Sequence, residues 1–348
     1  MKTAEYGIQL RPGSSASEIL YRCLDTAVQA HPSAFAEIDF PKSAADFKRR
    51  YVTTLPRFEA ARINHPARAD IARLLAETFQ AHLVYANDEG THPLQEHLTR
   101  PAKPLLLERL PPNCDPGWQP NLHFLKQDWA DLACLGKALL SANIVSQNAK
   151  VALDWLAQHL GEPHQLDLSG RKVVIFGASA EMAPTAQFSA AGAEILWLDL
   201  APPTVLATSL FRGGGVQFPV DGADLLTQPA EILATILAFA EGQPLDLCLY
   251  AYAPGQAREM RLAAAMNAIV NALPSALIQS ATMLLSPTTA TPLDSVDLLA
   301  LTHRKDSRPG WEAALDKLGL LGSGGGAVRQ GDLGASRTIV GTQGASYQ

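Results

Sequence analysis

The chain has 348 residues, of which 47% are hydrophobic and 18% are charged, and its formal net charge is -6. This composition is typical of a folded globular protein with more than one domain, and it excludes a disordered chain. The net negative charge gives no reason to expect nucleic acid or an anionic membrane surface as a partner.

The sequence carries no pattern of a targeting segment or a metal site. The four cysteines are scattered, without a Cys-x-x-Cys pair or the spacing of zinc ligands. The first residues contain no apolar segment of signal-peptide length, and no stretch approaches the roughly 20 apolar residues of a membrane helix. We therefore expect a cytoplasmic protein with no bound metal.

Residues 1–148 are expected to form a mainly helical N-terminal domain that caps the rest of the protein and shapes its specificity. Segments 15–31 and 67–86 place apolar residues at intervals of three and four, the pattern of an amphipathic helix. The stretch 98–121 is too rich in proline to form one regular element. Segment 128–161 predicts one long helix or two adjacent ones.

From residue 149 to residue 348, short apolar strands alternate with helices. Strands are expected over 172–177, 194–199, 216–220, 245–253 and 282–286. The helices between them are expected over 181–193, 229–242 and 257–273. This alternation predicts the α/β class, with a doubly wound parallel (Rossmann) sheet that binds a dinucleotide.

The first of these strands ends in a turn that is suited to binding an anion. Gly177 permits a tight turn into the following helix, whose amides then face the carboxyl edge of the sheet. Ser179 adds a hydroxyl group for a phosphate. Asp199 ends the second strand, 22 residues after Gly177, where an acidic side chain can accept hydrogen bonds from an adenosine ribose.

This unit resembles the first β-α-β unit of the short-chain dehydrogenase/reductase family, whose pattern at the turn is G-A-S-x-G-I-G. Gly177, Ala178 and Ser179 match that pattern, and Met182 takes the place of its apolar residue. The resemblance covers residues from about 166 to 290. It implies that these four residues contact the cofactor.

Other segments extend the resemblance to later strands of the family. Asp221 corresponds to an aspartate that lies near the adenine, and residues 250–253 stand where the family usually has N-N-A-G. The resemblance therefore implies cofactor contacts for Ala251 and Ala253. It also implies that Ser286, at the end of the fifth strand, polarises a substrate carbonyl group.

The chain also departs from the family pattern. Glu181 and Ala183 replace the second and third glycines, and a carboxylate at position 181 repels phosphates unless it points away or pairs with a base. The tyrosine and lysine pair, Y-x-x-x-K, does not follow Ser286. The remaining candidates for proton transfer are Tyr347, near the end of the chain, and Tyr252, whose position predicts a place beside the nicotinamide.

The sequence thus predicts an NAD(P)-dependent oxidoreductase that reduces a carbonyl group or oxidises an alcohol. NAD is expected rather than NADP, because Asp199 repels the additional phosphate. The substrate is expected to be a small molecule or carrier-bound, and the oligomeric state is open, a homo-oligomer included.

Two alternatives remain. Residues 166–178 are also similar to the entry into the cofactor domain of shikimate and methylene-tetrahydropterin dehydrogenases, which would put the catalytic groups in the N-terminal domain. The second alternative is a non-catalytic Rossmann binding module, which Glu181 and the missing lysine favour.

Overall fold

The fold of the chain was obtained as a computed structural model. The structure describes residues 6–112, 115, 117–124, 126–142, 144–161, 165–203, 213–253, 257–285, 289–318, 328–330 and 333–336. It divides into two compact units. Unit 1 comprises residues 1–9 and 84–284, and unit 2 comprises residues 10–83 and 285–348.

Unit 1 is built on a sheet of six strands, which gives the chain the predicted α/β class. The strands are β4 (Leu107–Leu110), β7 (Lys172–Phe176), β8 (Glu194–Leu198), β9 (Val216–Pro219), β10 (Leu245–Leu249) and β11 (Ile278–Met283). Their order is β11-β10-β7-β8-β9-β4. The pairs from β11 to β9 are parallel, and β4 joins β9 at the edge as an antiparallel strand.

Strand β7 is buried on both faces of this sheet. Val173 and Ile175 belong to one hydrophobic cluster, against which Phe188 of the following helix packs. Val174 and Phe176 are also fully buried and point to the other face, because successive residues of a strand alternate. The strand therefore has a continuous apolar sequence, as expected for a parallel strand inside an α/β sheet.

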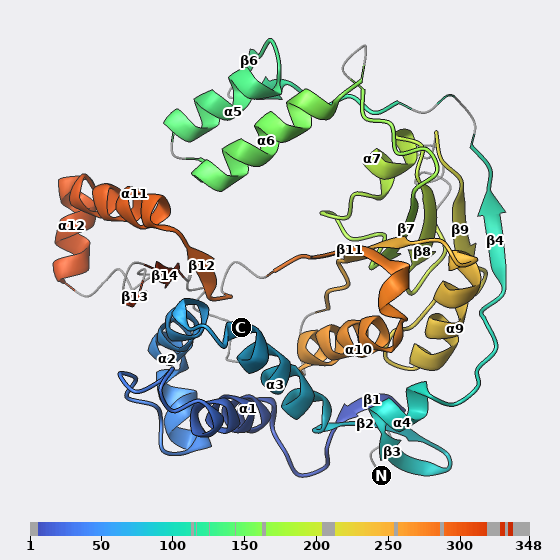
Figure 1. The fold of residues 1–348 in the computed structure, drawn as a ribbon, viewed down its shortest axis with the longest axis horizontal. Coiled ribbons are helices and arrows are strands. Elements are labelled where there is room, and N and C mark those ends of the chain that lie inside the picture. The colour runs from blue at the N-terminus through green and yellow to red at the C-terminus, as the bar shows by residue number, and fades with distance from the viewer. Residues whose placement is uncertain are drawn as a thin grey trace. The chain divides into compact units, whose positions relative to one another are not determined.

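Helices cover the two faces of the sheet. They are α7 (Thr185–Ala190), α9 (Pro229–Ala240) and α10 (Arg258–Ala272). Figure 1 shows α7 on one side of the sheet and α9 and α10 on the other. Helix α9 begins with Pro229 in its first turn, where the missing N–H costs no hydrogen bond.

The strand predictions differ in how closely they agree with the structure. The first four predicted strands coincide with β7 to β10, although β10 ends at Leu249 and not at residue 253. The fifth prediction, 282–286, overlaps β11 only at its end. Strand β11 begins at Ile278 and includes the exposed polar residues Gln279 and Ser280. It therefore lacks the continuous apolar sequence by which the other strands were predicted.

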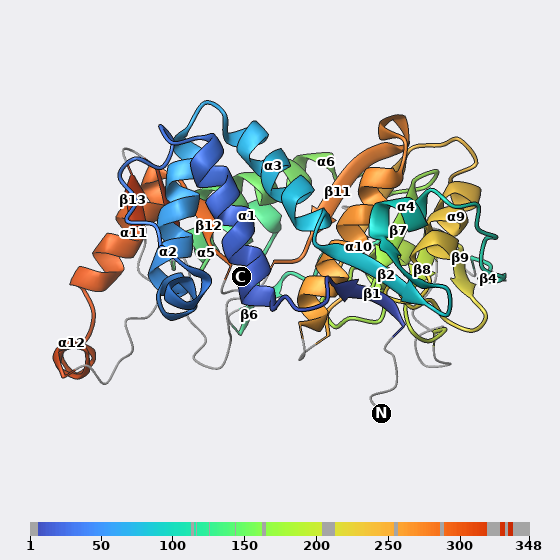
Figure 2. The same ribbon diagram turned by 90° about the horizontal axis from the view of Figure 1, so that it is seen from below.

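A small three-stranded sheet also belongs to unit 1, apart from Leu10 and Leu83. It consists of β1 (Gly7–Leu10), β2 (Leu83–Asn87) and β3 (Gly90–Pro93), and it is followed by the short helix α4 (Leu94–Leu98). Strands β2 and β3 pair antiparallel. In Figure 2 strands β1 and β2 lie side by side. The amide of Ile8 donates to the carbonyl of Leu226 (2.7 Å), and the Tyr85 hydroxyl donates to the carbonyl of Thr227 (2.5 Å), so this sheet is fixed to the segment after β9.

The remaining elements of unit 1 lie between β4 and β7. They are the hairpin of β5 (His123–Phe124) and β6 (Gln127–Asp128) and the helices α5 (Leu132–Ser141) and α6 (Gln147–His159). The two helices pack together through a cluster formed by Leu132, Leu135 and Leu139. Segment 128–161 therefore contains two helices, which was one of the two predicted outcomes.

Unit 2 combines residues from the two ends of the chain. Its helices are α1 (Ala16–Ala30), α2 (Ala44–Asn64), α3 (Arg68–Gln80), α11 (Ser295–Asp306) and α12 (Gly310–Lys317). Its sheet consists of β12 (Thr291–Leu293), β13 (Val328–Gln330) and β14 (Leu333–Ser336). Helix α2 contacts all three strands. In the core, the rings of Phe35 and Phe58 stack with their centroids 4.4 Å apart.

These units differ from the expected division at residues 148 and 149. That boundary falls inside α6 and inside unit 1, while residues 285–348 belong to unit 2. The predicted helix over 67–86 ends at Gln80, and β2 follows from Leu83. The tertiary structure overrides the helical periodicity there, because Leu83 and Val84 are buried as part of a sheet.

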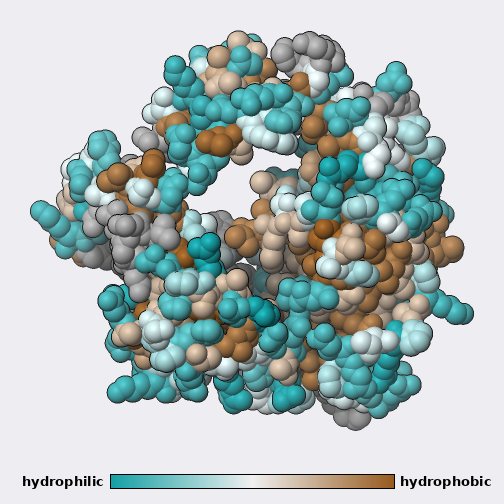
Figure 3. Space-filling view, in the orientation of Figure 1, coloured by the Kyte–Doolittle hydropathy of each residue, from teal (hydrophilic) through white to brown (hydrophobic). Residues whose placement is uncertain are grey.

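Figure 3 shows apolar residues gathered over the part of unit 1 that contains the six-stranded sheet and its helices. No helix among the described residues is long and apolar enough to cross a membrane.

The Tyr85–His97 pair generates a prediction about pH. The two rings stack with centroids 3.5 Å apart, and within the described part of the chain neither nitrogen of His97 has a hydrogen-bond partner. Burial lowers the pKa of His97 below its usual 6.5, and Arg100 and His92 act in the same direction, while Glu231 opposes them. Below about pH 6.5 the unfolded chain therefore binds the proton more readily than the folded chain, and stability falls as the pH falls.

We expect His97→Phe, which keeps a ring against Tyr85, to lose less stability than the wild type between pH 7.5 and pH 5.5. Urea unfolding at the two pH values measures the difference. Equal losses in both proteins would show that His97 does not contribute to the pH dependence.

Candidate functional site

A pocket of about 420 Å³ lies in unit 1, at the carboxyl edge of the six-stranded sheet. Its walls come from the segments that follow β7, β8, β9 and β10, from helix α10 and from Tyr6. Strand β7 has β8 on one side and β10 on the other, so the strand order reverses at this point. Ligands of α/β proteins bind outside the carboxyl ends of the strands at such a reversal.

Gly177 ends β7 and forms the turn that the sequence predicts. Its φ is +75°, a left-handed conformation that glycine adopts without steric cost. A Cβ atom at this position would lie 2.5 Å from the Cα of Ala251 and 2.6 Å from its nitrogen. The Gly177 amide donates to the carbonyl of Leu198 at the end of β8 (2.8 Å). The turn therefore depends on glycine both for its conformation and for its closeness to the segment after β10.

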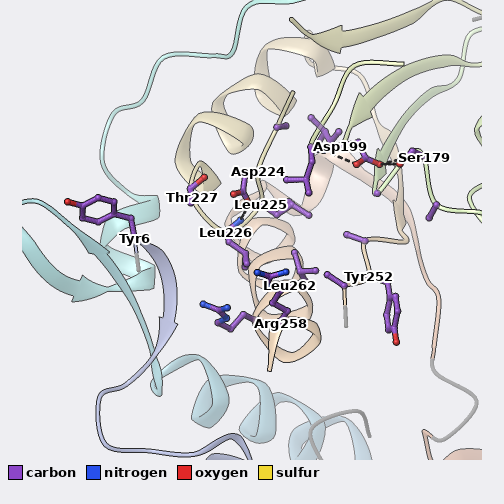
Figure 4. Close-up of a pocket in the computed structure, with 18 residues that line it drawn as sticks. Tyr6, Ser179, Asp199, Asp224, Leu225, Leu226, Thr227, Tyr252, Arg258 and Leu262 are labelled. Carbon is purple, nitrogen blue, oxygen red and sulfur yellow. Dashed lines mark hydrogen bonds between the residues drawn. The ribbon is translucent and has the colours of Figure 1, made fainter. Parts of the chain in front are cut away.

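Ser179 and Asp199 are joined by two hydrogen bonds, as Figure 4 shows. The backbone amide of Ser179 donates to Asp199 Oδ2 at 2.8 Å, and its hydroxyl donates to the same oxygen at 2.7 Å. The other oxygen, Oδ1, accepts from the Leu200 amide at 2.8 Å. The carboxylate of Asp199 thus lies against the amide at which the sequence predicts a phosphate.

Helix α7 begins later than predicted. It starts at Thr185 instead of residue 181 and has six residues, with Pro184 immediately before it. The Thr185 hydroxyl donates to the carbonyl of Ala178 (2.8 Å), which holds the preceding turns close to the helix. Because the macrodipole acts mainly within the first turn of a helix, α7 contributes little to anion binding at Gly177, eight residues upstream.

Three residues of the same loop lie outside the pocket wall. Ala178 is buried in the hydrophobic cluster of the sheet. Glu181 and Met182 are exposed, and neither is among the residues that line the pocket. Glu181 is therefore exposed outside the pocket wall.

The segment after β9 supplies a different aspartate from the predicted one. Asp221 is exposed and does not line the pocket, whereas Asp224, three residues later, does. Asp224 Oδ1 accepts from the Leu226 amide at 2.8 Å. Gly222 lies between the two aspartates and has a φ of +78°. Asp224, on the far side of this turn from Asp221, is the aspartate that lines the pocket.

The segment after β10 brings Ala251, Tyr252 and Ala253 to the pocket wall. The side chain of Tyr252 is 60% exposed, whereas Tyr250 packs against the hydrophobic cluster, and burial raises the pKa of its hydroxyl. Both tyrosines fall within the strand that was expected over 245–253. In the structure both follow the end of β10 at Leu249.

The other two candidates for catalysis, Ser286 and Tyr347, lie outside the described residues. Among the residues that are described, no group of three or more His, Cys, Asp or Glu side chains could hold a metal ion.

Two arginines of α10 also line the pocket, and the sequence reasoning missed both. Arg258 is exposed at the start of the helix, and Arg261 is 5% exposed. Arg261 Nη1 donates to Gln9 Oε1 at 2.8 Å and to the carbonyl of Ile8 at 3.4 Å. Arg258 could have been predicted to lie at the site, because it is a basic residue at the start of the helix that follows the fourth parallel strand. No local signal connects Arg261 with β1, which is about 250 residues away in the chain.

Gly177 is expected to tolerate substitution less well than Gly170, a matched control. Both have a positive φ, but a Cβ atom at Gly170 would have no neighbour within 4 Å. Gly170→Ala should cost roughly 1–2 kcal/mol of unfolding free energy for the left-handed backbone. Gly177→Ala should cost roughly 1–3 kcal/mol more, because the methyl group overlaps the backbone of Ala251. Urea unfolding of the two variants checks this, and equal costs would contradict the close approach.

Comparison of the chain with protein-family models, with curated proteins and with solved structures found no significant match. The function of the pocket is therefore inferred from its own residues and geometry.

Proposed function

We propose that unit 1 is a Rossmann-type domain that binds NAD, and that the protein is an NAD-dependent oxidoreductase acting on a carbonyl group or an alcohol. The strand order supports the first part of this proposal. Numbered from β7, the parallel strands have the order 3-2-1-4-5, which is that of dinucleotide-binding doubly wound sheets.

The observation that carries the proposal is the position of the pocket relative to Gly177 and Asp199. Both residues line it, one at the turn after the first parallel strand and the other at the end of the second. In dinucleotide-binding domains, an acidic residue at the second position accepts hydrogen bonds from the adenosine ribose. Leu200 and Leu225 line the same pocket and supply apolar surface suited to an adenine ring.

The residues present fit NAD better than NADP. A phosphate on the ribose would approach the carboxylate of Asp199, and like charges repel. Bound NAD would supply the hydride acceptor or donor of the reaction. Tyr252, at the pocket wall beyond β10, would pass a proton to or from the substrate oxygen.

A second candidate function is a binding module without catalysis. The contact of Asp199 with the Ser179 amide favours it, because that amide is already satisfied by an internal carboxylate. A third arrangement, resembling shikimate and methylene-tetrahydropterin dehydrogenases, would place the catalytic groups in the N-terminal part of the chain, before residue 150. The division of the chain is compatible with it, because the sheet-bearing segment 84–284 follows a separate segment, residues 10–83, that belongs to unit 2.

We expect the purified protein to bind NAD more tightly than NADP, as measured by isothermal titration calorimetry. Asp199→Asn should weaken NAD binding about tenfold, which corresponds to about 1.4 kcal/mol, and should reduce the preference for NAD over NADP. The physical reason is that an amide accepts hydrogen bonds from the ribose less strongly and does not repel a phosphate.

Glu181→Gln is the matched control, because it removes one carboxylate charge four residues after Gly177 but outside the pocket wall. It should leave both affinities unchanged. Tighter binding of NADP than of NAD to the wild type would overturn the role of Asp199. Absence of binding of either dinucleotide would overturn the proposed function.

A further inference from the structure

Four charged side chains line the pocket, and they are the acidic Asp199 and Asp224 and the basic Arg258 and Arg261. Asp199 lines the pocket together with Ser179, and Figure 4 shows Arg258 apart from these two residues. Of the residues that line the pocket, Arg258 and Arg261 are the two basic ones, and both belong to α10. An anionic group inside the pocket is therefore favoured near the two arginines of α10 and disfavoured near Asp199 and Asp224.

The glycine turn is poorly suited to hold a phosphate in this chain. The amide and the hydroxyl of Ser179 both donate to Asp199 Oδ2. A phosphate that took over these donors would have to displace a carboxylate and would then lie beside it. The carboxylate of Asp199 therefore occupies the place at this turn that a phosphate would otherwise take.

The two arginines of α10 provide positive charge for a phosphate, which the turn after β7 does not. Arg261 is only 5% exposed. Its hydrogen bonds to Gln9 and to the carbonyl of Ile8 hold the guanidinium group at the pocket wall. A charge held in a protein interior acts strongly on a nearby anion, because water screens it little. Within the described part of the chain, Arg258 makes no hydrogen bond or ion pair, so its guanidinium is available to a ligand. Guanidinium groups match the geometry of phosphate oxygens.

We propose that Arg258 is the phosphate anchor of this pocket, with Arg261 as the buried positive charge that supports it. This inference rests on the proposed function and deepens it: the ligand is an adenine nucleotide whose phosphates are bound by α10 and not by the glycine turn. Its adenosine part lies toward Asp199, and its phosphates lie toward Arg258.

Titration calorimetry of the full-length protein with adenosine, ADP, NAD and inorganic pyrophosphate tests this assignment. Arg258→Gln should weaken binding of ADP, NAD and pyrophosphate at least tenfold and leave adenosine within twofold. Because Arg258 is exposed, its replacement is not expected to unfold the protein. The control is Arg109→Gln, which removes the same charge from β4 at a residue outside the pocket wall and should change none of these affinities.

The ionic strength supplies a second measurement. Between 50 and 200 mM salt, pyrophosphate binding to the wild type should weaken more than its binding to Arg258→Gln, since the variant has lost a charge that salt screens.

The outcomes separate this inference from the proposed function. If ADP and NAD bind the wild type and Arg258→Gln binds them equally well, the phosphate anchor is wrong and the proposed function stands. If pyrophosphate binds in an Arg258-dependent way but adenosine and NAD do not bind, the anchor stands and the proposed function is wrong. If none of the four compounds binds the wild type, both are overturned.

Discussion

The close approach of Gly177 to the backbone of Ala251 is the constraint on which the candidate site depends. Adjacent parallel strands, β7 and β10, end side by side, and the chain must leave them in different directions. With a hydrogen atom in place of a side chain, the two exits can touch at a distance that no other residue permits. The loops then diverge beyond this contact, and the pocket opens between them. Gly177 and Ala251 both line this pocket.

The electrostatics of the pocket follow from how the chain satisfies its own polar groups. An amide at the exit of a parallel strand needs an acceptor, and in nucleotide-binding proteins a phosphate commonly supplies it. Here Asp199 supplies it from the neighbouring strand. This arrangement satisfies the Ser179 amide without a ligand. The two basic side chains of the pocket wall, Arg258 and Arg261, belong to α10.

The N-terminal residues contribute to the same site through packing. Strand β1 is bonded to the segment after β9 through Ile8, and Gln9 holds the guanidinium of Arg261. The small sheet thereby connects two parts of the pocket wall, the loop after β9 and helix α10. A segment at the beginning of the chain is in this way part of unit 1, although the residues that follow it, from position 10 to 83, belong to unit 2.

Local patterns in the amino-acid sequence were enough to predict the α/β class, four of the parallel strands and the turn at Gly177. They were enough because strands buried on both faces have continuous apolar runs, and because a glycine after such a run has a local steric meaning. The same patterns place Asp199 at the end of β8, whereas the contact of its carboxylate with Ser179 depends on how the segments after β7 and β8 pack together. The same holds for β2, whose residues continue a helical periodicity, and for the exposed edge strand β11. Arg261 and Gln9 meet across most of the chain, and no local pattern records a contact that long-range packing creates.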